Sequence, residues 1–165
     1  THMQRELNFR IGQGFDVHPF VFFLPCILGG IEIPLEKGLA GHSDADVLVH
    51  ALMDALLGAI GESDIGVHFP DNDPSLKGID SCILLQGVMS LLQERGWAVG
   101  NADLTVLAEA PKISPFVSQM RDKLSKILGV DLSQITIKAT TTEKLGFVGR
   151  REGIAALAVA LLVRV

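Results

Sequence analysis

The segment Gly41–Gly61, GHSDADVLVHALMDALLGAIG, decides how this chain folds. Its apolar residues recur at the spacing of one helix face, which predicts an amphipathic helix. Ser43 and the acidic residue three positions later are typical of a capped helix start, and the helix should continue to about Ile60 before Gly61 ends it. The expected buried stripe consists of Val47, Leu48, Ala51, Leu52, Ala55 and Leu56.

Patterns on both sides of this helix predict the remaining elements. We expect helices over 81–95 and 114–128, strands over 9–18, 25–34 (bent at Gly29-Gly30), 102–108, 135–142 and 154–165, and loops over 35–41, 62–78 and 144–153. This order predicts an α+β fold. Residues 1–165 would form a single-domain sandwich, a mixed sheet covered on one face by helices, ferredoxin-like or chorismate-mutase-like.

The last expected strand alternates large and small residues, which strand geometry places on opposite faces. We expect the large face to pack under the helices. The small face would then let another sheet approach closely, as at a subunit interface. The large residues are Leu157, Val159, Leu161 and Val163, and the small ones are Ala156, Ala158 and Ala160.

The composition is that of a globular protein, with 48% hydrophobic and 20% charged residues among 165. A mean hydropathy of +0.37 indicates either a deeply buried core or apolar surface hidden against other subunits. The formal net charge of −5 argues against nucleic acid or an anionic membrane as the main partner. An anionic substrate would therefore need a metal ion, a few basic groups and backbone amides to neutralise it.

Cysteine usage and the ends of the chain indicate the expected compartment. Cys26 and Cys82 form no CxxC pair, which indicates two buried thiols in a reducing environment. We expect no secretory signal and no membrane span, because the apolar run over 20–28 is too short to cross a bilayer. Thr1–Met3 resembles a tag remnant, and residues 1–8 are expected to form a loose N-terminus.

Three residues suggest a metal site. Asp16 and His18 alternate on one face of a strand end, and a carboxylate beside an imidazole suits zinc or another divalent ion. A short Asp-x-His is more often a polar strand end, and His50 alone would more often be a satisfied core histidine. Asp46 or Asp54, at helical spacing from His50, could orient its ring. Together the three ligands would leave one open position, as in catalytic sites.

Three loops offer groups for an anionic ligand. His42-Ser43-Asp44 lies at the expected helix start, where backbone N–H groups favour anions, although an ordinary capping loop is the alternative. The acidic loop, with Asp64-Ile65-Gly66 and Phe69 to Asp73, is either a binding loop or a solvated turn. Ala108 to Lys112 is a strand end followed by a proline-fixed turn, whose exposed backbone could bind a base edge.

The threonine segment offers the most oxygen ligands. Thr140 to Glu143 brings four side-chain oxygens together at a strand end, for phosphates or for a hydrated cation through Glu143. Arg150 and Arg151 follow in a glycine-rich loop and suit phosphate. The alternative is a threonine run selected only for its strand propensity.

Taken together, these motifs closely resemble the 2-C-methyl-D-erythritol 2,4-cyclodiphosphate synthase family of the non-mevalonate isoprenoid pathway. They cover most of the chain from Arg10 onward, in the family's order and with compatible spacing. The matching stretches are GFDVH, ILGGIEIP, GHSDADVLVHALMDALLGAIG, DIGVHFPDNDP, GNADLTVLAEAPKISP and IKATTTEKLGFVGRREGIAA.

The resemblance implies roles for individual residues. It implies a zinc site at Asp16, His18 and His50, catalytic assistance from His42 and Thr141, and a magnesium or manganese ion at Glu143. It further implies that each site combines two subunits. The implied substrate contacts are Asp16, His18, His42, Ser43, Asp64, Ile65, Gly66, Phe69, Pro70, Asp71, Asn72 and Asp73 on one side, and Ala108, Glu109, Ala110, Pro111, Lys112, Ile113, Ser114, Thr140, Thr141, Thr142, Glu143, Phe147 and Arg150 on the other.

The implied activity is that of a phosphorus-oxygen lyase. It converts 4-diphosphocytidyl-2-C-methyl-D-erythritol 2-phosphate to the 2,4-cyclodiphosphate and releases CMP. The implied partners are this CDP-linked substrate and two further copies of the chain in a homotrimer, in a bacterial cytoplasm or a plastid-type organelle. Two alternatives remain open: a zinc-dependent nucleotide phosphohydrolase, and a non-enzymatic trimeric module that binds nucleotide or isoprenoid.

The chain departs from the family pattern at three places. Gln13 replaces a frequent histidine, and Arg151 stands where glycine is common, next to Arg150. Phe20 to Phe23 replaces a usually more polar loop, which suggests that it packs on a neighbour.

Overall fold

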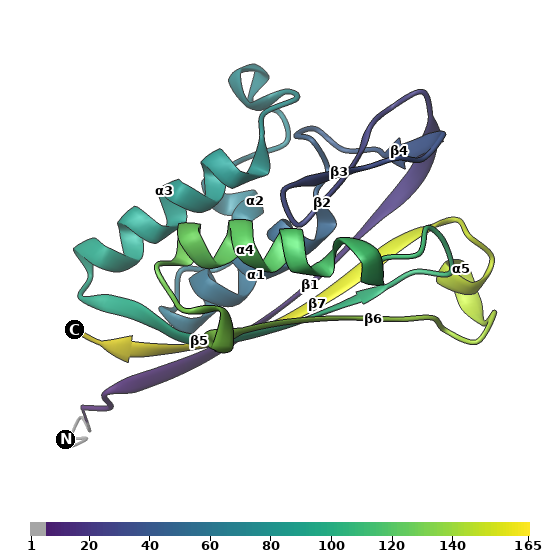
Figure 1. The fold of residues 1–165 in the computed structure, drawn as a ribbon. Helices are drawn as coiled ribbons and strands as arrows, with labels where there is room; N and C mark the ends of the chain where they lie inside the picture. Colours follow the sequence, from purple (N-terminus) through teal and green to yellow (C-terminus); the bar gives the residue numbers. More distant parts are fainter. Residues whose placement is uncertain (1–5) are drawn as a thin grey trace.

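The computed structural model describes residues 6–165, so the proposed tag remnant at Thr1–Met3 lies outside the described residues. A mixed sheet carries the long helices on one side (Figure 1), in agreement with the predicted α+β class. The strands are β1 (Phe9–Phe22), β2 (Cys26–Leu28), β3 (Ile31–Ile33), β4 (Lys37–Leu39), β5 (Trp97–Leu107), β6 (Ile135–Thr140) and β7 (Gly153–Arg164). The helices are α1 (Val47–Ala59), α2 (Ile65–His68), α3 (Ser81–Glu94), α4 (Val117–Leu128) and α5 (Gly146–Gly149), with 3-10 turns at Pro74–Leu76, Ser114–Phe116 and Leu132–Gln134.

The five-stranded sheet has the order β4-β1-β7-β5-β6, and only the β5–β6 pair is parallel. The predicted single strand over 25–34 is wrong, because β2 and β3 form a separate hairpin. Gly29 and Gly30 both have positive φ, 59° and 76°, as a two-residue hairpin turn requires. The predicted loop over 35–41 also contains β4, which pairs with the far end of β1.

The start of α1 differs from the prediction, because Asp46 and not Ser43 is its N-cap. The Asp46 side chain accepts hydrogen bonds from the backbone N–H of Val49, Gly29 and Gly30, at 3.1, 2.9 and 2.7 Å. These three donors compensate a carboxylate that is fully buried. Burial, together with the charge of Asp44, nevertheless raises the pKa of Asp46 to about 6. Asp46 thus fastens the β2–β3 hairpin to α1.

The helix-covered surface of β1 and β7, which we call the closed face, is built from small residues at its centre, between the buried Ile154 and Leu162. A Cβ atom at Gly12 or Gly14 would lie 1.9 Å from the carbonyl oxygen of Ala55 or Ala51 in α1. The prediction for the last strand is therefore wrong: its alanine face, and not its large face, packs under the helix. The backbone of α1 lies too close to the sheet for larger side chains. The closed-face residues are Gly12, Gly14, Ala156, Ala158 and Ala160.

The opposite surface of the same strands, which we call the open face, carries the large residues. They are between 44% and 70% exposed, although all are apolar. The adjoining strands β5 and β6 are polar on this side, where Lys138 lies 3.0 Å from Asp103. The open-face residues are Phe9, Ile11, Phe15, Leu157 and Val159.

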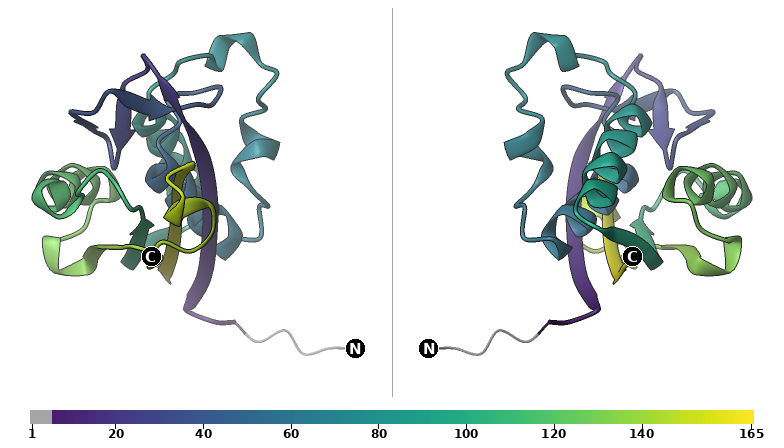
Figure 2. Two further views of the ribbon diagram at one scale, coloured as in Figure 1. Left: turned by 90° about the vertical axis from the view of Figure 1, so that its right-hand side faces the viewer. Right: turned by 90° about the vertical axis from the view of Figure 1, so that its left-hand side faces the viewer.

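The remaining helices complete the cover. As predicted, α3 and α4 are followed by Gly96 and Gly129, which have positive φ. In the left panel of Figure 2, α4 lies to the left of β1 and β7 and the α2 segment lies to their right. Both cysteines are buried and unbonded to each other, as expected. Among residues 6–165, none of the helices is long and apolar enough to span a membrane.

The apolar segment Phe20–Phe23 is partly explained by the extension of β1. Phe20 packs against the core, and Phe22 lies under the Lys37 ammonium, 4.7 Å from the ring centre. Nothing in the structure explains Phe23, which is 95% exposed.

Candidate metal and phosphate site

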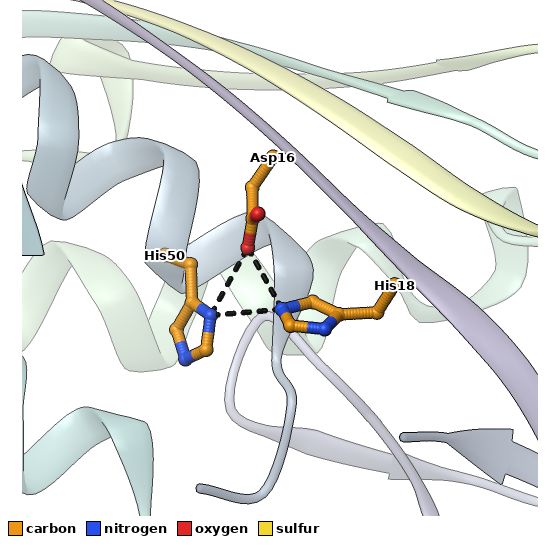
Figure 3. A group of neighbouring side chains, drawn as sticks. All are labelled: Asp16, His18 and His50. Atoms are coloured by element: carbon orange, nitrogen blue, oxygen red, sulfur yellow. Dashed lines mark hydrogen bonds and ion pairs between the residues drawn. The ribbon is translucent and has the colours of Figure 1, made fainter. Parts of the chain in front are cut away.

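Asp16, His18 and His50 point toward one another at the junction of β1 and α1 (Figure 3). Asp16 Oδ2 lies 2.9 Å from His18 Nε2 and 3.0 Å from His50 Nδ1. The two imidazole nitrogens are 3.1 Å apart. The structure therefore brings together the three predicted ligands, from two separate elements.

The closed face positions these side chains. Asp16 and His18 continue the row of Gly12 and Gly14 along β1, because alternate residues of a strand share a face. Because Gly12 and Gly14 have no Cβ atom, α1 can pack closely against this row. As a result, His50, which precedes Ala51 in α1, meets Asp16 directly. His50 is only 7% exposed, so the site lies at the edge of the core.

The geometry fits a divalent ion such as zinc. Zinc bonds to nitrogen and oxygen of 2.0–2.2 Å place tetrahedral ligands about 3.3 Å apart, close to the observed separations. Zinc-binding imidazoles also hydrogen-bond through their other nitrogen. Nδ1 of His18 lies 2.9 Å from the Ala40 carbonyl oxygen, and Nε2 of His50 lies 3.0 Å from the hydroxyl oxygens of Ser43 and Ser81.

The expectation that Asp46 or Asp54 orients the His50 ring is wrong. The Asp46 side chain accepts hydrogen bonds from three backbone N–H groups instead. The Asp54 side chain accepts one from the backbone N–H of Ile65 at 2.8 Å. Ser81, at the start of α3, takes this place. No pattern in the sequence brings Ser81 to His50, because the contact depends on how α3 packs against α1.

The charges of the three residues support one another. Burial alone would raise the pKa of Asp16, but hydrogen bonds and charge from His18 and His50 outweigh it and lower this pKa well below its ordinary value. Burial works against a charged His18, but Asp16 outweighs it and raises the pKa of His18. Without an ion, the site therefore favours a carboxylate paired with a protonated imidazole. A bound cation would compete with that proton.

A cavity of about 390 Å³ opens beside the three ligands. It is lined by many of the predicted contact residues: His42, Ser43, Asp64, Ile65, Gly66, Phe69 and Asp71. Pro70, Asn72 and Asp73 do not line it. The rest of the lining, which no sequence pattern assigns to this cavity, consists of Gly41, Asp54, Leu76 and Leu84. Leu84 belongs to the periodic core pattern of α3, so its pattern carries no functional signal.

Hydrogen bonds hold the loop that closes this cavity. His42 Nε2 lies 2.6 Å from the carbonyl oxygen of Asp73, whose side chain accepts from Ser75. Asp64 caps α2, and Asp54 binds the next residue of the loop, Ile65. The segment over 62–78, predicted as a loop, is thus fixed by α2 and a 3-10 turn.

The threonine segment lines a different cavity. This second cavity, of about 600 Å³, is lined by Ala108, Glu109, Pro111, Lys112, Ile113, Ser114, Ala139, Thr140 and Thr141. Ala110, Thr142, Glu143, Phe147 and Arg150 lie outside its lining. The two cavities share no lining residue. Within one chain, then, the structure does not bring Thr141 or Glu143 to the metal ligands.

Glu109 organises the loop after β6. Its Oε1 accepts from the backbone N–H of Lys144 at 3.0 Å and of Thr142 at 3.1 Å. These hydrogen bonds, that of Lys144 first, lower the pKa of Glu109. Glu143 and Lys144 have positive φ, so the loop is held in a conformation that L-residues rarely adopt. Glu143 is exposed on this turn.

The departure at Arg151 also has a conformational explanation. Arg151 has φ 60°, in the left-handed region that glycine occupies without strain. The turn keeps its shape because the backbone N–H groups of Arg150 and Arg151 bond to Gly146 and Val148. Arg150 is exposed and pairs with Glu152 at 2.9 Å.

The chain is similar to known proteins over nearly its whole length. The YgbB family profile matches residues 9–163. A protein of Bacillus subtilis (strain 168) named 2-C-methyl-D-erythritol 2,4-cyclodiphosphate synthase is 58% identical over 154 residues, which are 93% of this chain and 98% of that protein. One of the same name from Lysinibacillus sphaericus (strain C3-41) is 55% identical over 156 residues, 94% and 99% of the two chains.

Solved structures agree in fold. Bifunctional IspDF of Campylobacter jejuni matches with a TM-score of 0.91 and 43% identity, over 95% of this chain and 42% of that longer chain. A CDP complex of Plasmodium falciparum IspF matches with a TM-score of 0.84 and 36% identity, over 96% and 99%. The chain therefore belongs to the YgbB family, and the relatives that match it over most of its length are named 2-C-methyl-D-erythritol 2,4-cyclodiphosphate synthase.

Proposed function

We propose that this chain converts 4-diphosphocytidyl-2-C-methyl-D-erythritol 2-phosphate to 2-C-methyl-D-erythritol 2,4-cyclodiphosphate and CMP, as a phosphorus-oxygen lyase. The observation that carries the proposal is the convergence of Asp16, His18 and His50 beside an open cavity. The names of the relatives supply the reaction. The CDP bound in the Plasmodium falciparum protein supports a cytidine nucleotide as part of the substrate.

The reaction is intramolecular and needs no protein nucleophile. An oxygen of the 2-phosphate attacks the β-phosphorus, the new P–O bond closes the ring, and the bond to CMP breaks. The obstacle is that an anion attacks an anion. A divalent ion at Asp16, His18 and His50, zinc by its donor set, would supply Lewis-acid stabilisation of phosphate charge.

The chain itself holds and orients the substrate. Ser43 and His42 border the cavity beside the ligands and are placed to contact a phosphate. Asp64 to Gly66 would bind the sugar-alcohol hydroxyls, and Glu109, Thr140 and Thr141 would contact the cytidine diphosphate in the second cavity. Holding the attacking oxygen in line with phosphorus supplies roughly 7–11 kcal/mol of the barrier in favourable cases.

We further propose that the working unit is a homotrimer with its active sites between subunits. The two cavities share no lining residue, which fits an active site that is completed by residues of a second chain. The exposed apolar open face supports such an assembly, since contiguous apolar surface of this kind marks interfaces. Its position corrects the expectation that the alanine face forms the interface. Glu143, exposed on its loop, would hold the magnesium or manganese ion against the diphosphate.

Phosphorus NMR of the purified protein with the CDP-linked substrate tests the reaction. We expect the substrate signals to be replaced by those of a cyclic diphosphate and CMP. A linear phosphate product would identify the phosphohydrolase instead. Substrate that binds but stays unchanged, with zinc present, would identify the non-enzymatic module.

Mixing two inactive variants tests whether sites are shared. His50→Ala removes a metal ligand, and Thr141→Ala removes the threonine of the second cavity. After subunit exchange, some interfaces would pair an intact metal half with an intact threonine half, so part of the turnover should return. No rescue at any mixing ratio, or a monomer by light scattering at working concentration, would exclude sites between subunits.

Other expectations stay predictions. These are the single domain over 1–165, its ferredoxin-like or chorismate-mutase-like assignment, and a cytoplasmic location, which the bacterial origin of the relatives supports.

A further inference from the structure

Ser81 joins His50 to a carboxylate that lies away from the metal ligands. The Ser81 hydroxyl oxygen is 3.0 Å from His50 Nε2 and 2.5 Å from Oδ1 of Asp44. Ser81 is fully buried, so water does not compete for these bonds. The three side chains come from α3, α1 and the loop before α1, and form one continuous chain of hydrogen bonds.

The direction of each hydrogen bond follows from Asp44. Its carboxylate can only accept, and it also receives the backbone N–H of Ser81 at 3.1 Å and of Asp46 at 3.1 Å. The hydroxyl proton of Ser81 therefore goes to Asp44. The oxygen of Ser81 is left to accept a proton from His50, so Nε2 of His50 carries its hydrogen. In the neutral ring that a bound cation requires, Nδ1 then offers its lone pair to the position between Asp16 and His18.

We propose that Ser81, held by Asp44, is a positioning residue that fixes the tautomer and the orientation of the His50 ring for a divalent cation. The inference rests on the metal-site part of the proposed function. It does not depend on which reaction the site performs. Outer-sphere partners of this kind typically change metal affinity by about 10–100-fold when they are removed.

Ser43 has a different role, although its hydroxyl oxygen is also 3.0 Å from His50 Nε2. It is half-buried and lines the cavity, and among residues 6–165 no carboxylate accepts a hydrogen bond from its hydroxyl. That proton is available for a phosphate oxygen in the cavity. Without Ser81 and Asp44, a freely turning hydroxyl could instead donate to Nε2. The other tautomer would then direct an N–H at the metal position.

Zinc affinity tests the proposal without reference to turnover. Chelator competition should show the zinc dissociation constant of Ser81→Ala about 10–100-fold above that of the wild-type protein. Asp44→Asn should weaken zinc similarly, because an amide cannot accept at all three positions. The double variant should lose no more than Ser81→Ala alone, since both changes break one chain. Ser81→Thr, which keeps the hydroxyl, should recover affinity.

The matched control is Ser90→Ala, an exposed serine on the same helix, which should leave zinc affinity unchanged. Wild-type zinc affinity in Ser81→Ala would overturn the proposal. If that variant does not fold, Asp44→Asn decides, and wild-type zinc affinity in it would overturn the proposal. Zinc binding without cyclic product would refute the proposed reaction alone.

Discussion

The closed and open faces belong to the same two strands, yet their side chains differ completely. At its centre, the closed face carries glycine and alanine and is buried under α1, whereas the open face carries phenylalanine, leucine, isoleucine and valine and is largely exposed. Hydrophobicity alone would predict that the larger side chains are the buried ones. The separation of backbones decides otherwise, because α1 approaches β1 until its carbonyl oxygens leave no room for a Cβ atom at Gly12 or Gly14.

The difference assigns a separate task to each face. The closed face continues into the metal site, since Asp16 and His18 follow the two glycines in the same row. The metal half of the site is therefore built within one chain. The open face contributes nothing to that half, and its apolar surface suits contact with further copies.

The largest effect is expected on the closed face. Gly14→Ala would place a methyl group 1.9 Å from the carbonyl oxygen of Ala51. Neither backbone can move without separating α1 from the sheet, so we expect a loss of about 3 kcal/mol or more in the free energy of unfolding, at the upper end of overpacking effects. Urea unfolding of the zinc-free protein measures it.

Gly87→Ala is the matched control, because nothing lies within 4 Å of a Cβ atom at that position of α3. It should stabilise the protein by about 0.5–1 kcal/mol, because alanine loses less backbone entropy than glycine in a helix. Equal stability of the Gly14→Ala and Gly87→Ala variants would show that α1 does not pack as closely as described.

The next effect concerns the open face. Leu157→Asp introduces a charge at a residue that is 44% exposed in the single chain. The isolated chain should lose no more than about 1 kcal/mol, but an unpaired charge buried between subunits should prevent assembly. We expect a folded monomer by analytical ultracentrifugation, with turnover reduced at least about a hundredfold, roughly 2.7 kcal/mol in the barrier.

Ile83→Asp is the corresponding control on α3. Ile83 is 55% exposed but lies on a helix away from the open face, so this variant should assemble and turn over normally. A Leu157→Asp protein that remains trimeric would place the interface elsewhere.

Zinc binding by the monomeric Leu157→Asp variant tests whether the metal half of the site is built within one chain. Because Asp16, His18 and His50 come from one chain, Leu157→Asp should still bind one zinc ion per chain with near-wild-type affinity. His50→Ala should show the reverse: an assembled protein that has lost zinc. Elemental analysis after gel filtration measures both. Loss of zinc from the monomer would mean that the metal half also needs a neighbour.

Much of the fold follows from local patterns. Periodicity located α1, α3 and α4, and glycines marked where α3 and α4 end, because these signals depend on neighbours within a few residues. The faces of β7 could not be predicted this way. Alternation separates two sets of side chains, but which set is buried depends on how closely α1 approaches.

The site also contains some residues that the sequence predicts and others that it does not. Asp16, His18 and His50 are chemically distinctive, and the motif resemblance joined them across the sequence. Ser81 and Asp54 are ordinary helix residues whose importance comes only from what packs beside them. The cap at Asp46 was missed because Ser43, also a good capping residue, precedes it in the same segment.

The smallest expected effect is the change in stability of Gly58→Ala, which can be compared with Gly14→Ala where α1 packs on β1. Gly58 of α1 also faces β1, but a Cβ atom there would lie 3.9 Å from the carbonyl oxygen of Gln13, at ordinary contact distance. The packing of α1 on β1 therefore excludes a methyl group at Gly14 and leaves room for one at Gly58. Gly58→Ala should stabilise the protein by about 0.5–1 kcal/mol, since alanine loses less backbone entropy than glycine in a helix. Urea unfolding beside Gly14→Ala gives opposite signs for the same chemical change. A destabilised Gly58→Ala would mean that α1 is tightly packed along its whole length, and that the glycines at 12 and 14 are not special.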